Sequence, residues 1–309
     1  MTEFAFRAPP RAVRERAVLE PWWAGVDRWS LAAVLVLCVT GIVLALAASP
    51  PLAEENGVWT YHYVQRQAAF TALALAIILG LSLLPPRLLR RVGALLFIAA
   101  LGALAALPWI GTDHGKGAVR WLSLGGVSLQ PSEFLKPGFV LVAAWLMAGA
   151  EQRGGPPGRS IAGLLAVAIA GALVLQPDFG QAVLVLAVFT GMLFLSGAPI
   201  PLLLGLGAAV AAGGVAAYHH SAHFARRIDL YLTGQLEPNT QLAYAEAAIR
   251  EGGFLGVGVA QGSVKWILPD AHTDFIIAVA AEEFGLLLTL FVIGLFLFVT
   301  VRALVRLHG

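Results

Sequence analysis

The chain of 309 residues is 59% hydrophobic and only 12% charged, with a formal net charge of +2. A water-soluble domain carries about twice that fraction of charged residues, so the composition excludes an ordinary soluble protein. The small positive charge gives no support to nucleic-acid binding, because the basic residues of a membrane protein face anionic lipid headgroups. We therefore expect contact with a membrane and none with nucleic acid.

Apolar stretches recur along the chain, and each approaches the roughly 20 residues that cross a bilayer as a helix. They are continuous rather than alternating, which excludes the strands of a membrane β-barrel. The sequence predicts an all-α fold, a polytopic membrane helical bundle of about eight transmembrane helices. The predicted spans are 29–48, 67–84, 92–110, 134–150, 160–176, 180–197, 199–217 and 275–301.

The distribution of arginine predicts the orientation, because basic residues beside a span tend to stay in the cytoplasm. We expect residues 1–28 to form a cytoplasmic N-terminal tail and residues 29–309 a single transmembrane domain. Residues 218–273 form its large loop on the opposite, periplasmic face. The residues placed in the cytoplasm are Arg7, Arg11, Arg14, Arg16, Arg87, Arg90, Arg91, Arg153, Arg159, Arg302 and Arg306.

The large loop has the length of a functional segment rather than a simple connection. Within it, QLAYAEAAIREGG predicts a short helix that ends at Gly252 and Gly253. The glycines that follow do not have the spacing of a dinucleotide-binding loop, and no βαβ unit surrounds them.

Ionisable residues cluster where the large loop enters the last span: Asp270, His272, Asp274, Glu282 and Glu283. Asp274, or Thr273 beside it, is suited to cap the last helix. Alternatively, Asp274 lies at the mouth of a polar cavity and accepts a proton from a substrate hydroxyl, as a general base does. The two glutamates lie about two turns further in, where a carboxylate needs a cationic partner. We expect one of them to pair with a buried cation.

Two other loops on the same face carry charged residues. Glu133 and Lys136 have the i, i+3 spacing of an ion pair on one helix face. Lys136 could instead bind the diphosphate of a lipid-linked substrate. Arg120 precedes Trp121. This pair suits either a contact with the diphosphate or an anchor at the membrane interface. Asp178 lies in QPDFG, which predicts a turn between two spans.

No segment has the spacing of a dedicated metal site. His219, His220 and His223 form the histidine cluster of the chain. The i, i+4 pair in it could hold a metal on a helix, but we interpret the cluster as structural or solvated. The sequence also lacks the HExxH, Walker and GxSxG motifs, so familiar soluble hydrolase chemistries have no support.

Taken together, the loops resemble the SEDS family. The resemblance rests on GAVRWLSLGGVSLQPSEFLKP, QPDFGQA, the Arg226/Arg227 segment, GGFLGVGVAQGSVKWILPDAHTDF and AAEEFG. It extends over essentially the whole chain, and the combination of QPSE-x-x-K with P-x-A-H-T-D-F is highly specific. Within the family, VDRW at the first span and the last large motif are most similar to the division-associated, alphaproteobacterial branch.

The resemblance implies a peptidoglycan glycosyltransferase that polymerises lipid II on the periplasmic face during cell division, with inversion at the sugar carbon. Asp274 matches the family's essential aspartate, which implies that it is the general base. The resemblance and the chemistry of the leaving diphosphate make the basic residues of the far-side loops candidates for binding it. These are Arg120, Lys136, Arg226, Arg227 and Lys265, with Glu133, Asp178, His272, Glu282 and Glu283 in supporting positions.

The resemblance also implies partners and a location. The expected partners are lipid II, a class B penicillin-binding protein transpeptidase and other divisome proteins. The expected location is the bacterial inner (plasma) membrane, at the division septum. A divalent cation, Mg²⁺ or Mn²⁺, could assist the diphosphate.

Members of the family normally have ten spans, whereas eight are predicted here. The two last helices of the pattern are therefore not in this chain. Two alternatives to the enzyme stay open: a lipid II flippase, and an inactive, shortened scaffold that binds a division transpeptidase. The polar residues favour the enzyme because they gather on one face, whereas a transporter places polar groups near the bilayer midplane.

Overall fold

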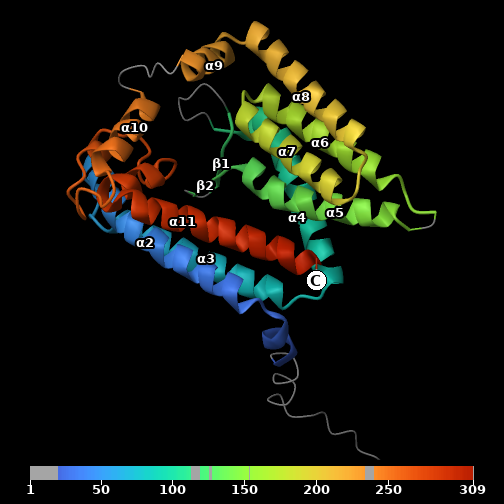
Figure 1. The fold of residues 1–309 in the computed structure, drawn as a ribbon, viewed down its shortest axis with the longest axis horizontal. Coiled ribbons are helices and arrows are strands. Elements are labelled where there is room, and N and C mark those ends of the chain that lie inside the picture. Colours follow the sequence, from blue (N-terminus) through green and yellow to red (C-terminus); the bar gives the residue numbers. More distant parts are fainter. Residues whose placement is uncertain (1–19, 113–118, 125–126, 153, 234–239, 309) are drawn as a thin grey trace, which may run out of the picture. The chain divides into compact units, whose positions relative to one another are not determined.

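The computed structural model describes residues 20–112, 119–124, 127–152, 154–233 and 240–308, and helices dominate these segments (Figure 1). Each of the eight predicted spans falls on a long apolar helix. Their bounds are α2 Arg28–Glu55, α3 His62–Ser82, α4 Pro86–Ile110, α5 Pro131–Ala150, α6 Gly158–Leu175, α7 Phe179–Leu195, α8 Ile200–His220 and α11 Ile276–His308. Among the described helices, seven are long and apolar enough to cross a membrane, and α7, with 17 residues, is shorter. The predicted polytopic helical bundle is confirmed.

Shorter elements occupy the loops. Strands β1 (Leu122–Leu124) and β2 (Val127–Leu129) form an antiparallel hairpin before α5. The large loop contains α9 (Ala222–Thr233), α10 (Gln241–Gly252) and the 3-10 turn η1 (Val264–Trp266). Helix α10 is the short helix predicted there: the Thr240 hydroxyl caps its beginning by accepting the N–H of Ala243, and Gly253 follows its end with φ 53°.

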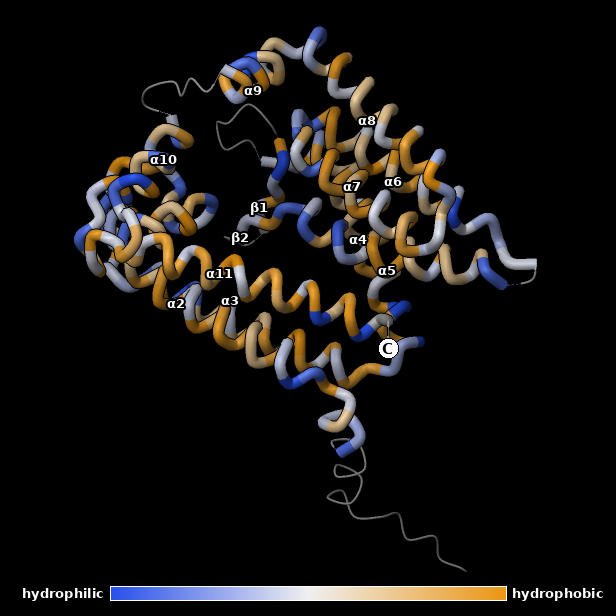
Figure 2. Tube along the Cα trace, in the orientation of Figure 1, coloured by the Kyte–Doolittle hydropathy of each residue, from blue (hydrophilic) through white to orange (hydrophobic). Residues whose placement is uncertain are grey.

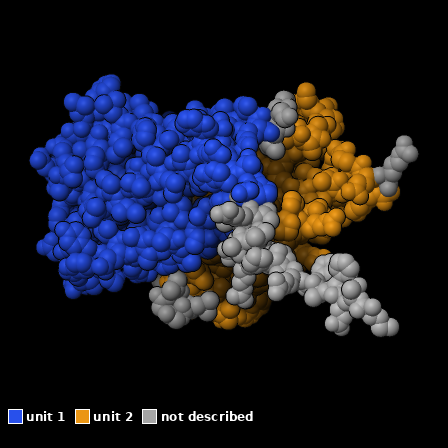
Figure 3. All heavy atoms as spheres, turned by 90° about the horizontal axis from the view of Figure 1, so that it is seen from below, with its two compact units in different colours: residues 1–83, 229–309 blue, residues 84–228 orange. Residues whose placement is uncertain are grey.

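The chain divides into two compact units, coloured separately in Figure 3. Unit 1 comprises residues 1–83 and 229–309, with α2, α3, α10, η1 and α11. Unit 2 comprises residues 84–228, with the hairpin and α4 to α8. Each unit has a buried apolar cluster of its own. That residues 29–309 act as one membrane domain stays a prediction.

The core of unit 2 forms where α4 packs closely on α5. Gly138 permits the approach, because a Cβ there would lie 2.9 Å from the backbone of Phe97. The Phe97, Phe139 and Phe189 rings fill the space between α4, α5 and α7, with centroids 6.4 Å apart for the first two and 6.5 Å for the last two. Close packing of this kind holds α5, which carries Glu133 and Lys136, and α7, which begins directly after the turn at Asp178.

In unit 1, α2 packs against both α3 and α11, and all three are apolar along most of their length (Figure 2). Asp27 lies just before α2, and its two carboxylate oxygens share the Nε–H of Arg302, at 2.8 and 2.6 Å from Nε. Asp27 also accepts a hydrogen bond from the Ser30 hydroxyl at 2.7 Å. The Arg302 guanidinium holds the pKa of the Asp27 carboxyl well below its usual range. The beginning of α2 and the end of α11 therefore lie at the same end of unit 1, as the arginine distribution requires. Arg7, Arg11, Arg14, Arg16 and Arg153 lie outside the described residues.

Candidate active site

A glycine-rich segment of unit 1 folds directly against α11; residues 253–262 are called the glycine loop here. Helix α11 is interrupted at Gly285, which has φ 78° and ψ −175°. Beside the break, the N–H of Val257 donates to the Glu282 carbonyl at 2.9 Å, and the N–H of Leu286 donates to the Gly253 carbonyl at 2.9 Å. A Cβ on Gly256 would lie 2.1 Å from the Glu283 carbonyl oxygen. Glycine is needed at this position because the two backbones touch.

Two adjacent carboxylates on α11 hold the far end of the glycine loop. Glu283 forms a buried ion pair with Lys265 and also accepts the N–H of Ala260 at 3.0 Å. Glu282 is fully buried and accepts the N–H of Val264 at 2.7 Å. The prediction that one of these glutamates pairs with a buried cation is confirmed, with Glu283 as the member of the pair.

Lys265 is committed to this cluster. Its side chain is only 2% exposed, and its Nζ donates to Glu283 and, at 3.1 Å, to the carbonyl of Ala47 on α2. The lysine thus ties η1, which follows the glycine loop, to both α2 and α11. Its role in binding a diphosphate stays a prediction, and in this arrangement its hydrogen bonds are directed into the protein.

Asp274 lies in the turn that leads into α11, and its side chain is exposed. The helix begins at Ile276, two residues later. The N–H groups of Thr273 and Phe275 both donate to the carbonyl of Asp270, at 3.1 and 3.3 Å, and this closes the turn. Among the described residues, neither the Thr273 nor the Asp274 side chain accepts a backbone N–H of α11, so the structure does not support the capping interpretation. The Asp274 carboxylate is open to a ligand.

His272 lies beside Asp274 and is half-buried. Its ring packs against that of Tyr63, with centroids 5.6 Å apart. Burial lowers the pKa of His272, and the nearby carboxylates of Asp270 and Asp274 oppose the shift. The imidazole is therefore neutral at neutral pH, so it does not neutralise the charge on Asp274.

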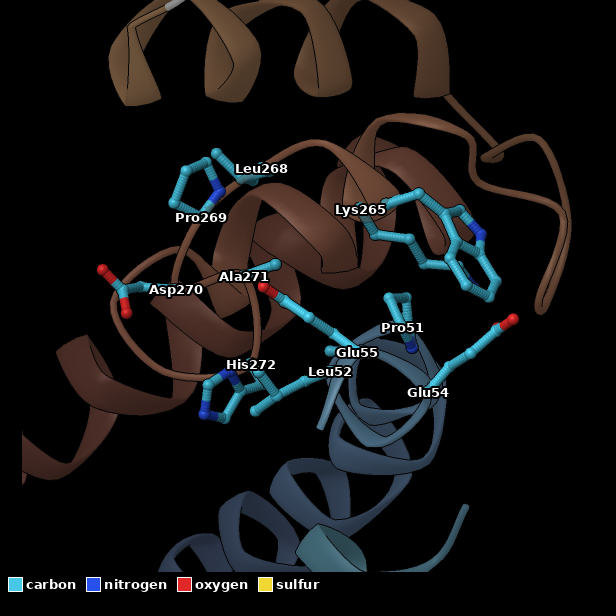
Figure 4. Close-up of a pocket in the computed structure, with 12 residues that line it drawn as sticks. Pro51, Leu52, Glu54, Glu55, Lys265, Leu268, Pro269, Asp270, Ala271 and His272 are labelled. Atoms are coloured by element: carbon cyan, nitrogen blue, oxygen red, sulfur yellow. The ribbon is translucent and has the colours of Figure 1, made fainter. Parts of the chain in front are cut away.

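A cavity of about 310 Å³ lies between the end of α2 and residues 265–272 (Figure 4). Its polar lining includes Glu54, Glu55, Asp270 and His272, and Figure 4 shows Glu55 reaching toward the turn at Ala271. Lys265 is the one lysine or arginine among the described lining residues, and it is already paired. This cavity is acidic, so it is unsuited to a diphosphate.

Unit 2 holds the second group of predicted residues. Lys136 and Glu133 form the predicted ion pair in the first turn of α5, with Nζ and Oε1 2.8 Å apart. Gln181 of α7 donates to the same Glu133 oxygen at 3.1 Å. The pair is partly exposed, with 25% of the lysine and 49% of the glutamate side chain accessible. Lys136 can thus exchange its partner for a ligand without burying an unpaired charge.

Arg120 has a structural task within unit 2. It donates to the carbonyls of Gln176 and Pro177, which follow the last turn of α6, and its Nε lies 3.9 Å from Asp178. A cation at the C-terminal end of a helix satisfies free carbonyls and interacts favourably with the helix dipole. Asp178 lies in the predicted turn between α6 and α7, which is confirmed. A diphosphate contact of Arg120 stays a prediction.

The remaining candidates are partly described. Arg226 is exposed on α9, and Arg227 is on the same helix, with its side chain outside the described residues. Gln181 was missed by sequence reasoning, although its place in QPDFGQA, three residues after Asp178, marked it as a polar group entering a span. Among the described residues, no three His, Cys, Asp or Glu side chains gather as metal ligands. These side chains alone do not form a site for the expected Mg²⁺ or Mn²⁺.

Comparison with known proteins identifies the fold. A family model described as "Cell cycle protein", for FtsW, RodA and SpoVE, matches residues 28–308. The chain belongs to this family. The resemblance to the SEDS proteins is thereby confirmed.

Two FtsW proteins illustrate the relationship. The probable peptidoglycan glycosyltransferase FtsW of Caulobacter vibrioides is 39% identical over 293 residues, which cover 94% of this chain and 75% of that protein. The protein of the same name from Halorhodospira halophila is 34% identical over 304 residues, covering 94% and 76%. The FtsW-like character predicted from the motifs is confirmed.

Solved structures agree with the fold. One chain, from a study of the structural coordination of polymerization and crosslinking by a peptidoglycan synthase complex, is 25% identical with a TM-score of 0.70, covering 91% of this chain and 77% of that one. The rod shape determining protein RodA of Thermus thermophilus is 24% identical with a TM-score of 0.60, covering 91% and 74%.

Proposed function

We propose that this protein is a peptidoglycan glycosyltransferase that polymerises lipid II into glycan strands during cell division. The observation that carries the proposal is the exposed Asp274 carboxylate, which has no hydrogen bond or ion pair among the described residues and lies beside a neutral imidazole. A general base must be ionised and accessible to the hydroxyl it deprotonates. The FtsW relatives, named as probable peptidoglycan glycosyltransferases, supply the reaction class.

The reaction assigns one step to Asp274. The carboxylate removes the proton from the 4-hydroxyl of the acceptor's GlcNAc, and that oxygen attacks C1 of the donor's MurNAc. The bond between C1 and the diphosphate oxygen breaks, and undecaprenyl diphosphate leaves from the opposite face of the sugar. Attack opposite the leaving group converts an α-linked lipid into a β-linked glycan, so the enzyme inverts the configuration at C1.

The leaving diphosphate needs positive charge as the bond breaks. Lys136 is the first candidate, since its ion pair is exposed and exchangeable. Arg226 on α9 is the second, with Arg227 on the same helix. Lys265 and Arg120 are weaker candidates because their donors already serve the packing of each unit. A divalent cation, Mg²⁺ or Mn²⁺, that assists the leaving diphosphate is part of this proposal.

The proposed setting is the inner membrane at the septum, with the N-terminus in the cytoplasm and Asp274 on the periplasmic side. The basic residues Arg302 and Arg306 beside Asp27 support a cytoplasmic position for that end of unit 1. A class B penicillin-binding protein and other divisome proteins are the proposed partners. A relative studied for polymerization together with crosslinking supports a transpeptidase partner.

The test is glycan formation from purified lipid II by the parent, Asp274→Asn and Asp270→Asn, each with and without the cognate transpeptidase. Asp270 is the matched control because its carboxylate lies close to Asp274 in sequence. The Asp270 carboxylate accepts a hydrogen bond from Gln241 at 3.3 Å, and asparagine tolerates the φ of 57° at this position. We expect polymer from the parent and Asp270→Asn, and none from Asp274→Asn. Polymer from Asp274→Asn would remove Asp274 as the base. A folded parent that makes no polymer but moves lipid II across vesicles would instead be a flippase, and one that does neither a scaffold.

A further inference from the structure

The outer side of the glycine loop is unusually apolar for a segment outside the helices. Phe254, Leu255 and Val259 are 70%, 76% and 65% exposed. No charged residue occurs from Gly252 to Val264 in the sequence. Large apolar side chains that gather on a surface without charges mark a contact with a partner or a membrane.

Part of the backbone of this loop forms hydrogen bonds to α11 on its inner side. The N–H groups of Val257, Gly258 and Ala260 donate to the Glu282 carbonyl, the Glu283 carbonyl and the Glu283 carboxylate. The carbonyls of Gly253 and Phe254 accept from Leu286 and Leu287 of α11, at 2.9 and 3.4 Å. Non-helical backbone can enter the hydrocarbon region only where its polar groups are bonded within the protein. Five backbone groups of the glycine loop meet this condition through their hydrogen bonds to α11.

The lengths of two helices locate the loop relative to a bilayer. The Asp27–Arg302 ion pair marks one membrane surface, because a charged pair of this kind is stable at the headgroups. From Arg302, α11 reaches Gly285 after about 26 Å at 1.5 Å per residue. From Asp27, α2 reaches Ala47, the partner of Lys265, after about 30 Å. The hydrocarbon core is about 30 Å thick, so both helices place the loop at its opposite edge.

The exposed side of the loop also continues the apolar surface of a span. Leu287 donates its N–H to Phe254 and is itself 54% exposed, as are Leu290 and Phe291 to similar extents further along α11. We propose that the glycine loop dips into the lipid leaflet farther from Asp27, where Phe254, Leu255 and Val259 contact acyl chains. The loop then anchors the Asp274 turn at the depth of the lipid headgroups. This inference does not rest on the glycosyltransferase activity.

Site-directed spin labelling in lipid nanodiscs tests the contact. Cys38, the one cysteine of the chain, is replaced by alanine, and single cysteines are introduced at Phe254, Leu255 or Val259. Two residues with exposed side chains serve as controls: Leu297, which lies on α11 between Gly285 and Arg302, and Asn56 at the end of α2, about 43 Å from Asp27 along the helix. For each nitroxide, the rate of collision with apolar oxygen is compared with the rate of collision with a polar nickel chelate.

We expect labels in the loop to collide with oxygen in preference to the chelate, as the Leu297→Cys label does. Labels that favour the chelate, as at Asn56→Cys, would overturn the proposal because the loop would lie in water. Low collision with both reagents at all three loop positions would overturn it as well, since protein would then cover the loop. Three independent positions, all with exposed side chains, keep the test decisive if one variant fails to fold.

Discussion

Each unit of the protein contains a lysine–glutamate ion pair, and the two pairs differ in their surroundings. Lys265 and Glu283 in unit 1 are almost completely buried; the carbonyl of Ala47 on α2 accepts a further hydrogen bond from Lys265, and Glu283 accepts one from the N–H of Ala260 in the glycine loop. Lys136 and Glu133 in unit 2 are partly exposed in the first turn of α5. The same residue types therefore serve different purposes: one pair shapes the loop before Asp274, and the other can meet a charged substrate.

The energetics of the two pairs follow from solvent access. Burying both charges carries a large desolvation cost, so removing one partner leaves an uncompensated charge that is strongly unfavourable. An exposed pair is screened by water and contributes about 0–1 kcal/mol. Replacing Lys265 should therefore lower the stability of the protein, whereas replacing Lys136 should lower its activity.

The largest effect is expected from separating the buried pair. Lys265→Met or Glu283→Gln alone should each lower the free energy of unfolding by about 3–5 kcal/mol, because each leaves one buried charge unpaired. The double variant should recover most of that loss, since glutamine can still accept the N–H of Ala260. Denaturant titration in detergent measures the free energy of unfolding of the parent, the two single variants and the double variant.

The same double variant separates structure from substrate binding at Lys265. If the lysine only holds the glycine loop, the folded double variant polymerises lipid II with a KM close to that of the parent. A folded double variant with a strongly raised KM would show that Lys265 contacts the substrate. A double variant no more stable than the single ones would contradict the assigned role of the pair.

A smaller effect, confined to activity, is expected at the exposed pair. Lys136→Met should lower kcat/KM for lipid II about 100-fold, by removing a charge that stabilises the leaving diphosphate, while stability changes by less than about 1 kcal/mol. Arg250→Met is the matched control, because Arg250 forms an exposed i, i+4 pair with Glu246 on α10. Unchanged kinetics for Lys136→Met would exclude Lys136 from the diphosphate site.

The smallest effect concerns pH. Because burial lowers the pKa of His272 in the folded protein, the unfolded state binds the proton more readily. The stabilising contribution is fully present above the ordinary histidine pKa of about 6.5 and is lost as the pH falls below it. The melting temperature of His272→Gln should therefore fall less than that of the parent between pH 7.5 and pH 5.5. An equal slope in the parent and the variant would contradict the shift.

Several features of the site could be predicted because they depend on neighbours in sequence. The i, i+3 spacing brought Lys136 to Glu133, and the depth of Glu282 and Glu283 in a span required a cation for one of them. The capping interpretation of Asp274 failed because α11 begins at Ile276, one residue later than a cap at Asp274 requires. The carbonyl contacts of Arg120 were not foreseen, since they join residues more than fifty positions apart.

Hydrophobicity along the chain by itself determined the membrane class and the long apolar helices, because a span must be continuous and apolar to satisfy its backbone in lipid. The local motifs determined the family and marked Asp274. Only the tertiary structure decided that Glu283 rather than Glu282 binds Lys265, that α11 breaks at Gly285, and that five backbone groups of the glycine loop bond to α11. These features depend on contacts between distant segments, and the burial of each charge, which sets its energy, arises only when those segments pack.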